Sequence, residues 1–193
     1  LSAIAAQHDG AFVLTPNQNV IIAGVTPERK EAVQKLLEEH GLAWPVSALR
    51  RNAMACVALP TCGLALAESE RYLPDLVTVL EAEIDRAGLR DEEITIRMTG
   101  CPNGCARPYL AEIGLVGVRP GVYNLYLGGA FNGTRLSKLY LQEIGPNEIV
   151  AALSPLFARY AVGRESGERF SDFVIRSGVV RATRAEGEFH ASP

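Results

Sequence analysis

The stretch Ile94-Thr95-Ile96-Arg97-Met98-Thr99-Gly100-Cys101-Pro102-Asn103-Gly104-Cys105 joins a strand pattern to a pair of cysteines. Residues 94–98 alternate along the chain as a half-buried strand does, which predicts a strand. The strand runs directly into the two cysteines, which have the spacing C-x3-C. Both glycines lack a Cβ atom, so the backbone can pass close to a bulky cofactor, and the asparagine can adopt backbone conformations that other residues resist. The stretch therefore predicts a strand that ends in a cradle.

A second pair of cysteines lies upstream, at Cys56 and Cys62, with the spacing C-x5-C. Each pair is found where a loop meets regular structure, so we expect the four sulfurs to converge from two directions. Four thiolates are the usual ligands of a cubane iron–sulfur cluster. A cluster is therefore the first interpretation of this spacing, ahead of zinc and of unligated thiols.

The alternatives differ in what they require. Structural zinc prefers a C-x2-4-C spacing, which is shorter than the first pair. Two disulfides would need an oxidising compartment and a signal peptide, and the sequence indicates neither. The C-x2-C-x2-C pattern of a simple ferredoxin is absent. Spacing alone leaves zinc and free thiols open.

The N-terminal region has the pattern of two strands and a helix. Apolar runs at residues 11–14 and 20–24 flank a Pro/Asn turn and predict the strands. Thr26 and Pro27 predict the start of a helix, and Gly41 its end. This piece is too small to be a domain, so we expect its strands to find partners in chain upstream.

The region that begins at Trp44-Pro45 has a mixed pattern. It predicts helices at residues 64–72, from Pro74 to Gly88 and at 146–160, with a kink or break at Pro155. On the second of these helices, the predicted buried face is Leu76, Val79, Leu80 and Ile84. Further strands are expected at residues 113–118, 122–127 and 173–180, followed by a frayed tail after Arg181. The fold class is α+β, with mixed sheets and packed helices.

Composition limits the class of protein. The chain has 193 residues, of which 48% are hydrophobic, and a net charge of −3 with both signs interspersed. This charge distribution argues against a nucleic-acid partner. No apolar run approaches the roughly 18–20 residues that cross a bilayer, and no leader is visible, so we expect a cytoplasmic protein without a membrane partner. Because the chain begins at Leu1, it could be a fragment.

Several motifs lie around and between the two cysteine pairs. They are Asn52-Ala53-Met54-Ala55-Cys56, Pro60-Thr61-Cys62, Ala67-Glu68-Ser69-Glu70-Arg71, residues 99–108, Leu110-Ala111-Glu112-Ile113-Gly114-Leu115-Val116-Gly117 and Tyr123-Asn124-Leu125-Tyr126-Leu127-Gly128-Gly129. These motifs resemble the sulfite/nitrite reductase family. The resemblance runs from about residue 8 to residue 181, and the residues after Cys105 are similar to the sulfite-reducing branch.

The resemblance implies the cofactors and the reaction. It implies a 4Fe–4S cluster held by Cys56, Cys62, Cys101 and Cys105, with Cys105 shared with the iron of sirohaem. The expected reaction is assimilatory reduction of sulfite to sulfide with six electrons, supplied by a flavoprotein subunit or a ferredoxin. Rival functions are nitrite reduction with the same cofactors and a zinc-stabilised binding module without redox chemistry.

The resemblance also implies how the chain is divided. Residues 1–45 are expected to be part of a ferredoxin-like half-domain, and residues 46–193 the sirohaem and cluster domain, in the C-terminal portion of a longer enzyme. No catalytic acid is assigned, because the family's basic catalytic residues lie in upstream chain. We expect the fragment alone to be inactive.

Other polar residues have less specific signals. Asn103 and Arg107 are predicted to contact sirohaem, and Arg50, Arg51 and Arg97 are further candidates for its carboxylates. Each arginine has an equally good interpretation as a solvated surface residue. His8, His40 and His190 are expected to be structural or exposed, Tyr123 and Tyr126 to be strand residues, and Gly128-Gly129 to lie near the cofactor or form a simple turn.

Overall fold

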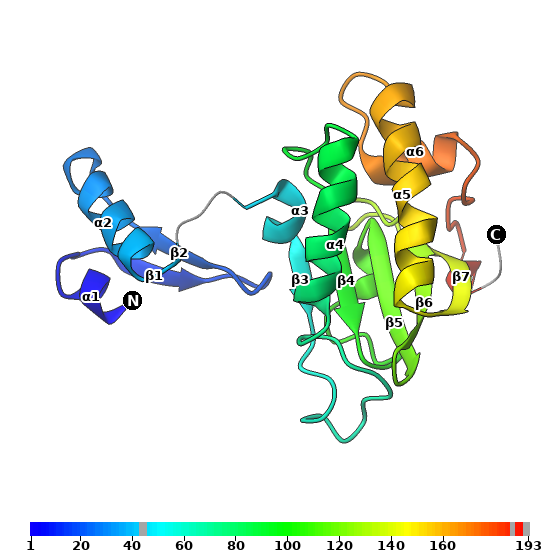
Figure 1. Cartoon of the computed structure of the whole chain (residues 1–193), viewed down its shortest axis with the longest axis horizontal. Coiled ribbons are helices and arrows are strands. Elements are labelled where there is room, and N and C mark those ends of the chain that lie inside the picture. Colours follow the sequence, from blue (N-terminus) through cyan, green and yellow to red (C-terminus); the bar gives the residue numbers. More distant parts are fainter. Residues whose placement is uncertain (43–45, 186–187, 191–193) are drawn as a thin grey trace. The chain divides into compact units, whose positions relative to one another are not determined.

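The computed structural model describes residues 1–42, 46–185 and 188–190, which form two compact units, residues 1–46 and 47–193. Trp44 and Pro45, the predicted start of the second region, lie outside the described residues. No helix in the described part of the chain is long and apolar enough to cross a membrane. The mixture of sheets and packed helices confirms the α+β class (Figure 1).

The first unit is a hairpin with two helices. It contains α1 (Ser2–Ala5), β1 (Ala11–Leu14), β2 (Val20–Ala23) and α2 (Pro27–Glu39), and both predicted strands and the helix are confirmed. β1 and β2 pair antiparallel, with Leu14 opposite Val20. Its buried side chains among the described residues are Ile4, His8 and Val33, whereas Leu14 is 80% exposed. The unit therefore has a small core and leaves much of its hairpin uncovered.

The second unit is built on a five-stranded sheet in the order β3-β4-β5-β6-β7. The strands are β3 (Ala53–Ala55), β4 (Ile96–Thr99), β5 (Ile113–Arg119), β6 (Val122–Leu127) and β7 (Lys138–Ile144). β3 and β4 pair in parallel, as do β4 and β5, whereas β5 pairs antiparallel with β6, and β6 with β7. The carboxyl ends of β3 and β4 therefore lie at the same edge of the sheet.

Helices cover one face of this sheet. They are α3 (Ala48–Arg51), α4 (Leu73–Arg86), α5 (Pro146–Gly163) and α6 (Phe170–Arg176), and α4 and α5 pack side by side (Figure 1). The short 3-10 helices are η1 (Pro108–Leu110) and η2 (Glu188–His190). Buried apolar side chains of α4, α5 and α6 and of all five strands make up the main core.

Two predicted elements are wrong. Residues 64–72 form turns and bends rather than a helix, because their N–H groups bond to distant carbonyls: Leu66 and Ala67 donate to Gly100, and Glu70 to Cys56. Residues 173–180 do not form a strand. They begin within α6, because Phe170, Phe173 and Val174 have helical spacing and are buried together.

The other differences concern helix faces and missed elements. Val79 is 50% exposed, and the buried face of α4 uses Val77 instead. α5 continues through Pro155 as one helix. Ala151, whose carbonyl loses its bond because proline has no N–H, lies on the exposed side, where water can replace that bond. α3, β3 and β7 were not predicted.

A buried carboxylate ties this sheet to α6. Glu112 has no exposed surface and accepts hydrogen bonds from the N–H groups of Thr95 (2.9 Å) and Ser171 (3.2 Å). A guanidinium nitrogen of Arg169 lies 3.9 Å away. Burial raises the pKa of Glu112, although these donors act in the opposite direction.

Glu112→Gln is expected to change how stability depends on pH. Because the pKa is raised in the folded state, wild-type stability falls as pH rises from the ordinary glutamate pKa through the raised one. Glutamine does not titrate. Its NH2 group would face the N–H of Thr95 or Ser171, so two donors would meet, which lowers the free energy of unfolding by about 1–3 kcal/mol. Urea unfolding should show the variant as less stable at acid pH, with a gap that narrows toward neutral pH. A gap that stays constant with pH would contradict this role.

Candidate cofactor site

The first cysteine loop begins where β3 ends. The N–H of Cys56 donates to the carbonyl of Met98 over 3.1 Å and so extends the pairing of β3 with β4. Ala58 has a positive φ of 49°, and the peptide bond between Leu59 and Pro60 is cis. The N–H of Cys62 then donates to the carbonyl of Ala58 over 2.8 Å. The C-x5-C segment is therefore a tight turn at the carboxyl edge of the sheet.

The second cysteine loop begins where β4 ends, at the same edge. The Thr99 hydroxyl donates to the carbonyl of Cys101 over 3.0 Å. Gly104, with a φ of +68°, donates through its N–H to the same carbonyl, and Arg107 donates to the carbonyl of Gly104. The predicted strand is confirmed and is followed by tight turns, and the role of these turns as a cofactor cradle stays a prediction.

Hydrogen bonds join the two loops. The N–H of Gly100 donates to Sγ of Cys56 over 3.3 Å. The carbonyl of Gly100 accepts from the N–H groups of Leu66 (2.8 Å) and Ala67 (3.0 Å). Ser69, which is fully buried, donates its hydroxyl hydrogen to the carbonyl of Met98 over 2.7 Å. These bonds hold the first loop against the beginning of the second.

Gly100 is required by this contact between the loops. A Cβ atom at Gly100 would lie 2.6 Å from both the Ala58 Cβ and the Ala67 carbonyl oxygen. Gly117 is restricted in the same way, because a Cβ there would lie 2.5 Å from the Gly100 carbonyl oxygen. The sequence predicted crowding by a cofactor, but protein atoms alone already exclude a side chain here. Ser69 and Gly117 lie in the motifs of the family resemblance, but neither was given a role of its own, because their role arises only from tertiary contacts.

The four thiols are chemically suited to hold a cluster. None is in a disulfide; Cys101 is buried, Cys56 and Cys62 are half-buried, and Cys105 is exposed. Within residues 1–42, 46–185 and 188–190, no three His, Cys, Asp or Glu side chains lie close enough together to hold a metal ion. The four free thiols and the hydrogen bonds that join their loops fit a four-thiolate ligand set. The convergence of all four sulfurs on one point stays a prediction.

Comparison with known proteins covers nearly the whole chain. Residues 1–40 match the nitrite/sulfite reductase ferredoxin-like half domain. The chain is 60% identical, over 98% of its length, to the sulfite reductase (NADPH) hemoprotein beta-component of Methylobacterium nodulans, and 58% identical over 99% to that of Staphylococcus haemolyticus. The chain is therefore similar, over nearly its whole length, to proteins of the nitrite/sulfite reductase family. It covers only 32% and 34% of these two relatives.

A solved structure has the same fold. The structure of the Mycobacterium tuberculosis NirA protein superposes with a TM-score of 0.78 at 27% identity, over 91% of this chain and 34% of that one. The fold of the chain is therefore of the sulfite/nitrite reductase type. The family implies sirohaem and iron–sulfur cofactors.

The arginines predicted to contact sirohaem have different surroundings. Arg50 binds Glu81 with two nitrogens, at 3.0 and 2.5 Å, and holds the pKa of that carboxyl below its usual value. These bonds hold Arg50 against α4 and favour its structural interpretation. Arg51 is exposed at the end of α3.

Arg97 and Arg107 lie close together. Arg97 projects from β4 and donates to the carbonyl of Arg107 over 3.5 Å, and Arg107 contacts Sδ of Met54, the residue paired with Arg97 in β3. Burial, and then the charge of Arg107, lowers the pKa of Arg97. Two neighbouring guanidiniums repel each other, so an anion between them would be stabilised.

The remaining predicted residues are placed as follows. Asn103, like Cys105 and Arg107, has an exposed side chain, so the second loop presents these three outward.

His8 is structural: its Nε2 lies 2.8 Å from the carbonyl oxygen of Ala23. His40 and His190 are exposed. Gly129 is a close backbone approach, because a Cβ there would lie 2.3 Å from the Ala111 carbonyl oxygen. Tyr123 and Tyr126 are strand residues of β6.

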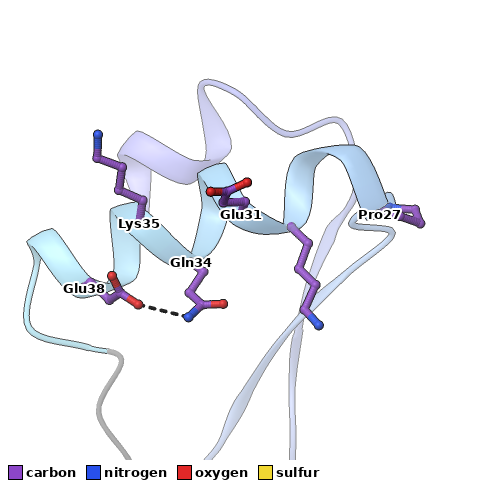
Figure 2. A pocket seen from close by; sticks show the side chains of 6 residues that line it. Pro27, Glu31, Gln34, Lys35 and Glu38 are labelled. Atoms are coloured by element: carbon purple, nitrogen blue, oxygen red, sulfur yellow. Dashed lines mark hydrogen bonds between the residues drawn. The ribbon is translucent and has the colours of Figure 1, made fainter.

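A polar groove of about 530 Å³ runs along α2 in the first unit. Figure 2 shows side chains that fan outward from the helix, with one hydrogen bond, from Gln34 to Glu38. The groove contains charges of both signs, from Lys35 and Glu31 among others, and no cysteine. It has no feature in common with the cysteine loops and carries no functional argument.

Proposed function

We propose that this chain is the part of an assimilatory sulfite reductase that holds a 4Fe–4S cluster and one side of sirohaem. The observation that carries the proposal is the joining of two cysteine loops by the bond from the Gly100 N–H to Cys56 Sγ. A backbone N–H directed at a sulfur stabilises the negative charge of a thiolate ligand and of a cluster. Loops that carried only unligated thiols would not need a backbone N–H directed at a sulfur between them.

In this proposal the four cysteines are the cluster ligands. Cys56 and Cys62 bind from the first loop, and Cys101 and Cys105 from the second. The exposed position of Cys105, next to the buried Cys101, supports Cys105 as the thiolate that also reaches the iron of sirohaem. When bound, the two cofactors would pass to sulfite, one at a time, the six electrons received from the electron donor that convert it to sulfide.

Basic and polar groups beside Cys105 serve the carboxylates of sirohaem. Arg97 and Arg107 offer two guanidiniums on one side of β3 and β4, and Asn103 offers an amide from the same loop. Charge-assisted bonds to carboxylates would offset the repulsion between the guanidiniums. The catalytic acids and the remaining cations would come from the rest of the longer enzyme.

The first unit is proposed as part of a ferredoxin-like half-domain, within residues 1–45. Its match to the half-domain model and its exposed hairpin support this assignment. Residues 46–193 would then be the cofactor domain. The NADPH and the beta-component in the names of the relatives favour a flavoprotein over a ferredoxin as the electron donor. The free thiols suit a reducing compartment such as the cytoplasm.

Metal analysis of the full-length enzyme, purified without oxygen, tests the proposal. We expect iron and acid-labile sulfide in a ratio of roughly five to four, from one cluster and one haem iron. Faster turnover of sulfite than of nitrite with a reduced dye would separate sulfite reductase from the nitrite alternative. Zinc without iron or labile sulfide would contradict the proposal and support the binding module.

A further inference from the structure

We propose that Tyr109 is a positioning residue that holds the turn carrying Cys105 in the shape needed for ligation. The inference rests on the proposed function of the four cysteines. Tyr109 lies in η1, four residues after Cys105, and has no place in the family motif described above.

The backbone of Tyr109 is fixed from two sides. Its carbonyl accepts hydrogen bonds from the N–H (2.8 Å) and the hydroxyl (3.1 Å) of Ser137, which directly precedes β7. The preceding residue, Pro108, packs so closely on β5 that a Cβ at Gly114 would lie 2.4 Å from its carbonyl oxygen. η1 therefore cannot move without disturbing β5 or the start of β7.

The ring of Tyr109 leans over the second cysteine loop. Its Cε2 atom lies 3.3 Å from the position that a Cβ on Gly104 would occupy. Its hydroxyl donates to the carbonyl of Pro102 over 3.4 Å. The ring thus touches the loop on both sides of Asn103, and it limits how far the residue before Cys105 can move.

Two other aromatic side chains pack against the ring of Tyr109. Tyr126 of β6 meets it edge-on, with ring centroids 5.2 Å apart, and His190 lies at 5.8 Å. The Tyr126 hydroxyl and Nδ1 of His190 are 3.0 Å apart, and Val116 and Leu139 complete the cluster around Tyr126. Burial, followed by the charge of Cys101, raises the pKa of Tyr109, so the hydroxyl keeps its proton at neutral pH.

Consequently, the position of Cys105 depends on the volume of this ring more than on its hydroxyl. Cys105 is exposed and Gly104 has no side chain of its own to pack against the protein, so the ring of Tyr109 provides the side-chain packing over Gly104. Removal of the ring would leave a gap into which the loop could relax. Removal of the hydroxyl alone would keep the gap filled.

Variants of the full-length holoenzyme test this role. Tyr109→Ala should change the electron paramagnetic resonance spectrum of the cluster and speed its loss to a chelator by roughly tenfold or more. Tyr109→Phe should behave as wild type. Tyr109→Leu keeps part of the side-chain volume, so its spectrum and chelation rate should lie between those of wild type and Tyr109→Ala. The leucine variant also keeps the test possible if the alanine variant fails to fold. Tyr140→Ala is the matched control, since Tyr140 is a half-buried tyrosine of β7 that packs on the main core. It should lower thermal stability without changing the spectrum.

Three outcomes would overturn the inference. A wild-type spectrum and chelation rate in both Tyr109→Ala and Tyr109→Leu would show that the ring does not position the loop. Equal effects in Tyr140→Ala would show general loosening of the fold. Wild-type enzyme without iron or labile sulfide would overturn the proposed function together with this inference, whereas the first two outcomes leave the proposed function intact.

Discussion

Cys105→Ser in the full-length enzyme is expected to abolish sulfite turnover, with a loss of more than about a hundredfold, because one sulfur is proposed to serve two cofactors. Serine oxygen is a harder and poorer ligand than thiolate for this iron. The other thiol of the second loop, Cys101, is buried and is itself a proposed cluster ligand, so it is not expected to replace Cys105. Both the cluster signal and the haem absorption band should change.

The other cysteines provide the comparison for this variant. Cys62→Ser should remove or cripple the cluster while leaving the thiolate for the haem iron in place. The haem absorption band distinguishes the roles, because it should change in Cys105→Ser and persist in Cys62→Ser, and magnetic coupling, measured by electron paramagnetic resonance, tests the bridge wherever both cofactors are retained. A Cys105→Ser enzyme that keeps this coupling would show that a different cysteine is the bridge.

Gly100→Ala is expected to destabilise the cofactor domain by roughly 3 kcal/mol, because the added methyl group overlaps atoms that cannot easily move. Its Cβ would lie 2.6 Å from Ala58 Cβ and from the carbonyl oxygen of Ala67, whose backbone also bonds to Gly100. Relief of this overlap must separate the two loops. It must also lengthen the bond from the Gly100 N–H to Cys56 Sγ, so cluster content should fall with stability.

Gly63→Ala is the matched control, because Gly63 lies in the first loop beside Cys62 and a Cβ there meets nothing within 4 Å. We expect this control to change stability by less than about 0.5 kcal/mol. Thermal unfolding and iron content, measured together on both variants, check the prediction. Full iron content and an unchanged unfolding midpoint in Gly100→Ala would contradict the close approach of the loops.

Local patterns predicted much of the fold. The hairpin of β1 and β2, the helices α2 and α4, and the strands β4, β5 and β6 all follow from periodicity and turn residues within their own segments. The segment at residues 64–72 does not, because its N–H groups are satisfied by Gly100 and Cys56 instead of by neighbours. α6 was mistaken for a strand because its seven residues are too few for the helical period to stand out.

The candidate site was predictable in its residues and less so in its construction. Spacing identified both cysteine pairs, and the resemblance identified the family. The reason for Gly100 is a contact with Ala58 and Ala67 that no local pattern reports, and the expected role of Arg50 is weakened by its bonds to Glu81. The packing of Tyr109 against Gly104 depends on how η1 lies on the sheet, which sequence periodicity does not determine.

The parallel pairing of β3 with β4 also sets an order of events during synthesis. The bond between the Gly100 N–H and Cys56 Sγ joins residues 44 positions apart. At about 5–20 residues per second, a ribosome takes roughly 2–9 s to add that length of chain. During that interval, Cys56 and Cys62 have been made without the strand that orders their loop. A cluster held as proposed by both cysteine loops would therefore find all of its ligands only after α4 has been made and β4 has docked, so its loading would follow these folding steps.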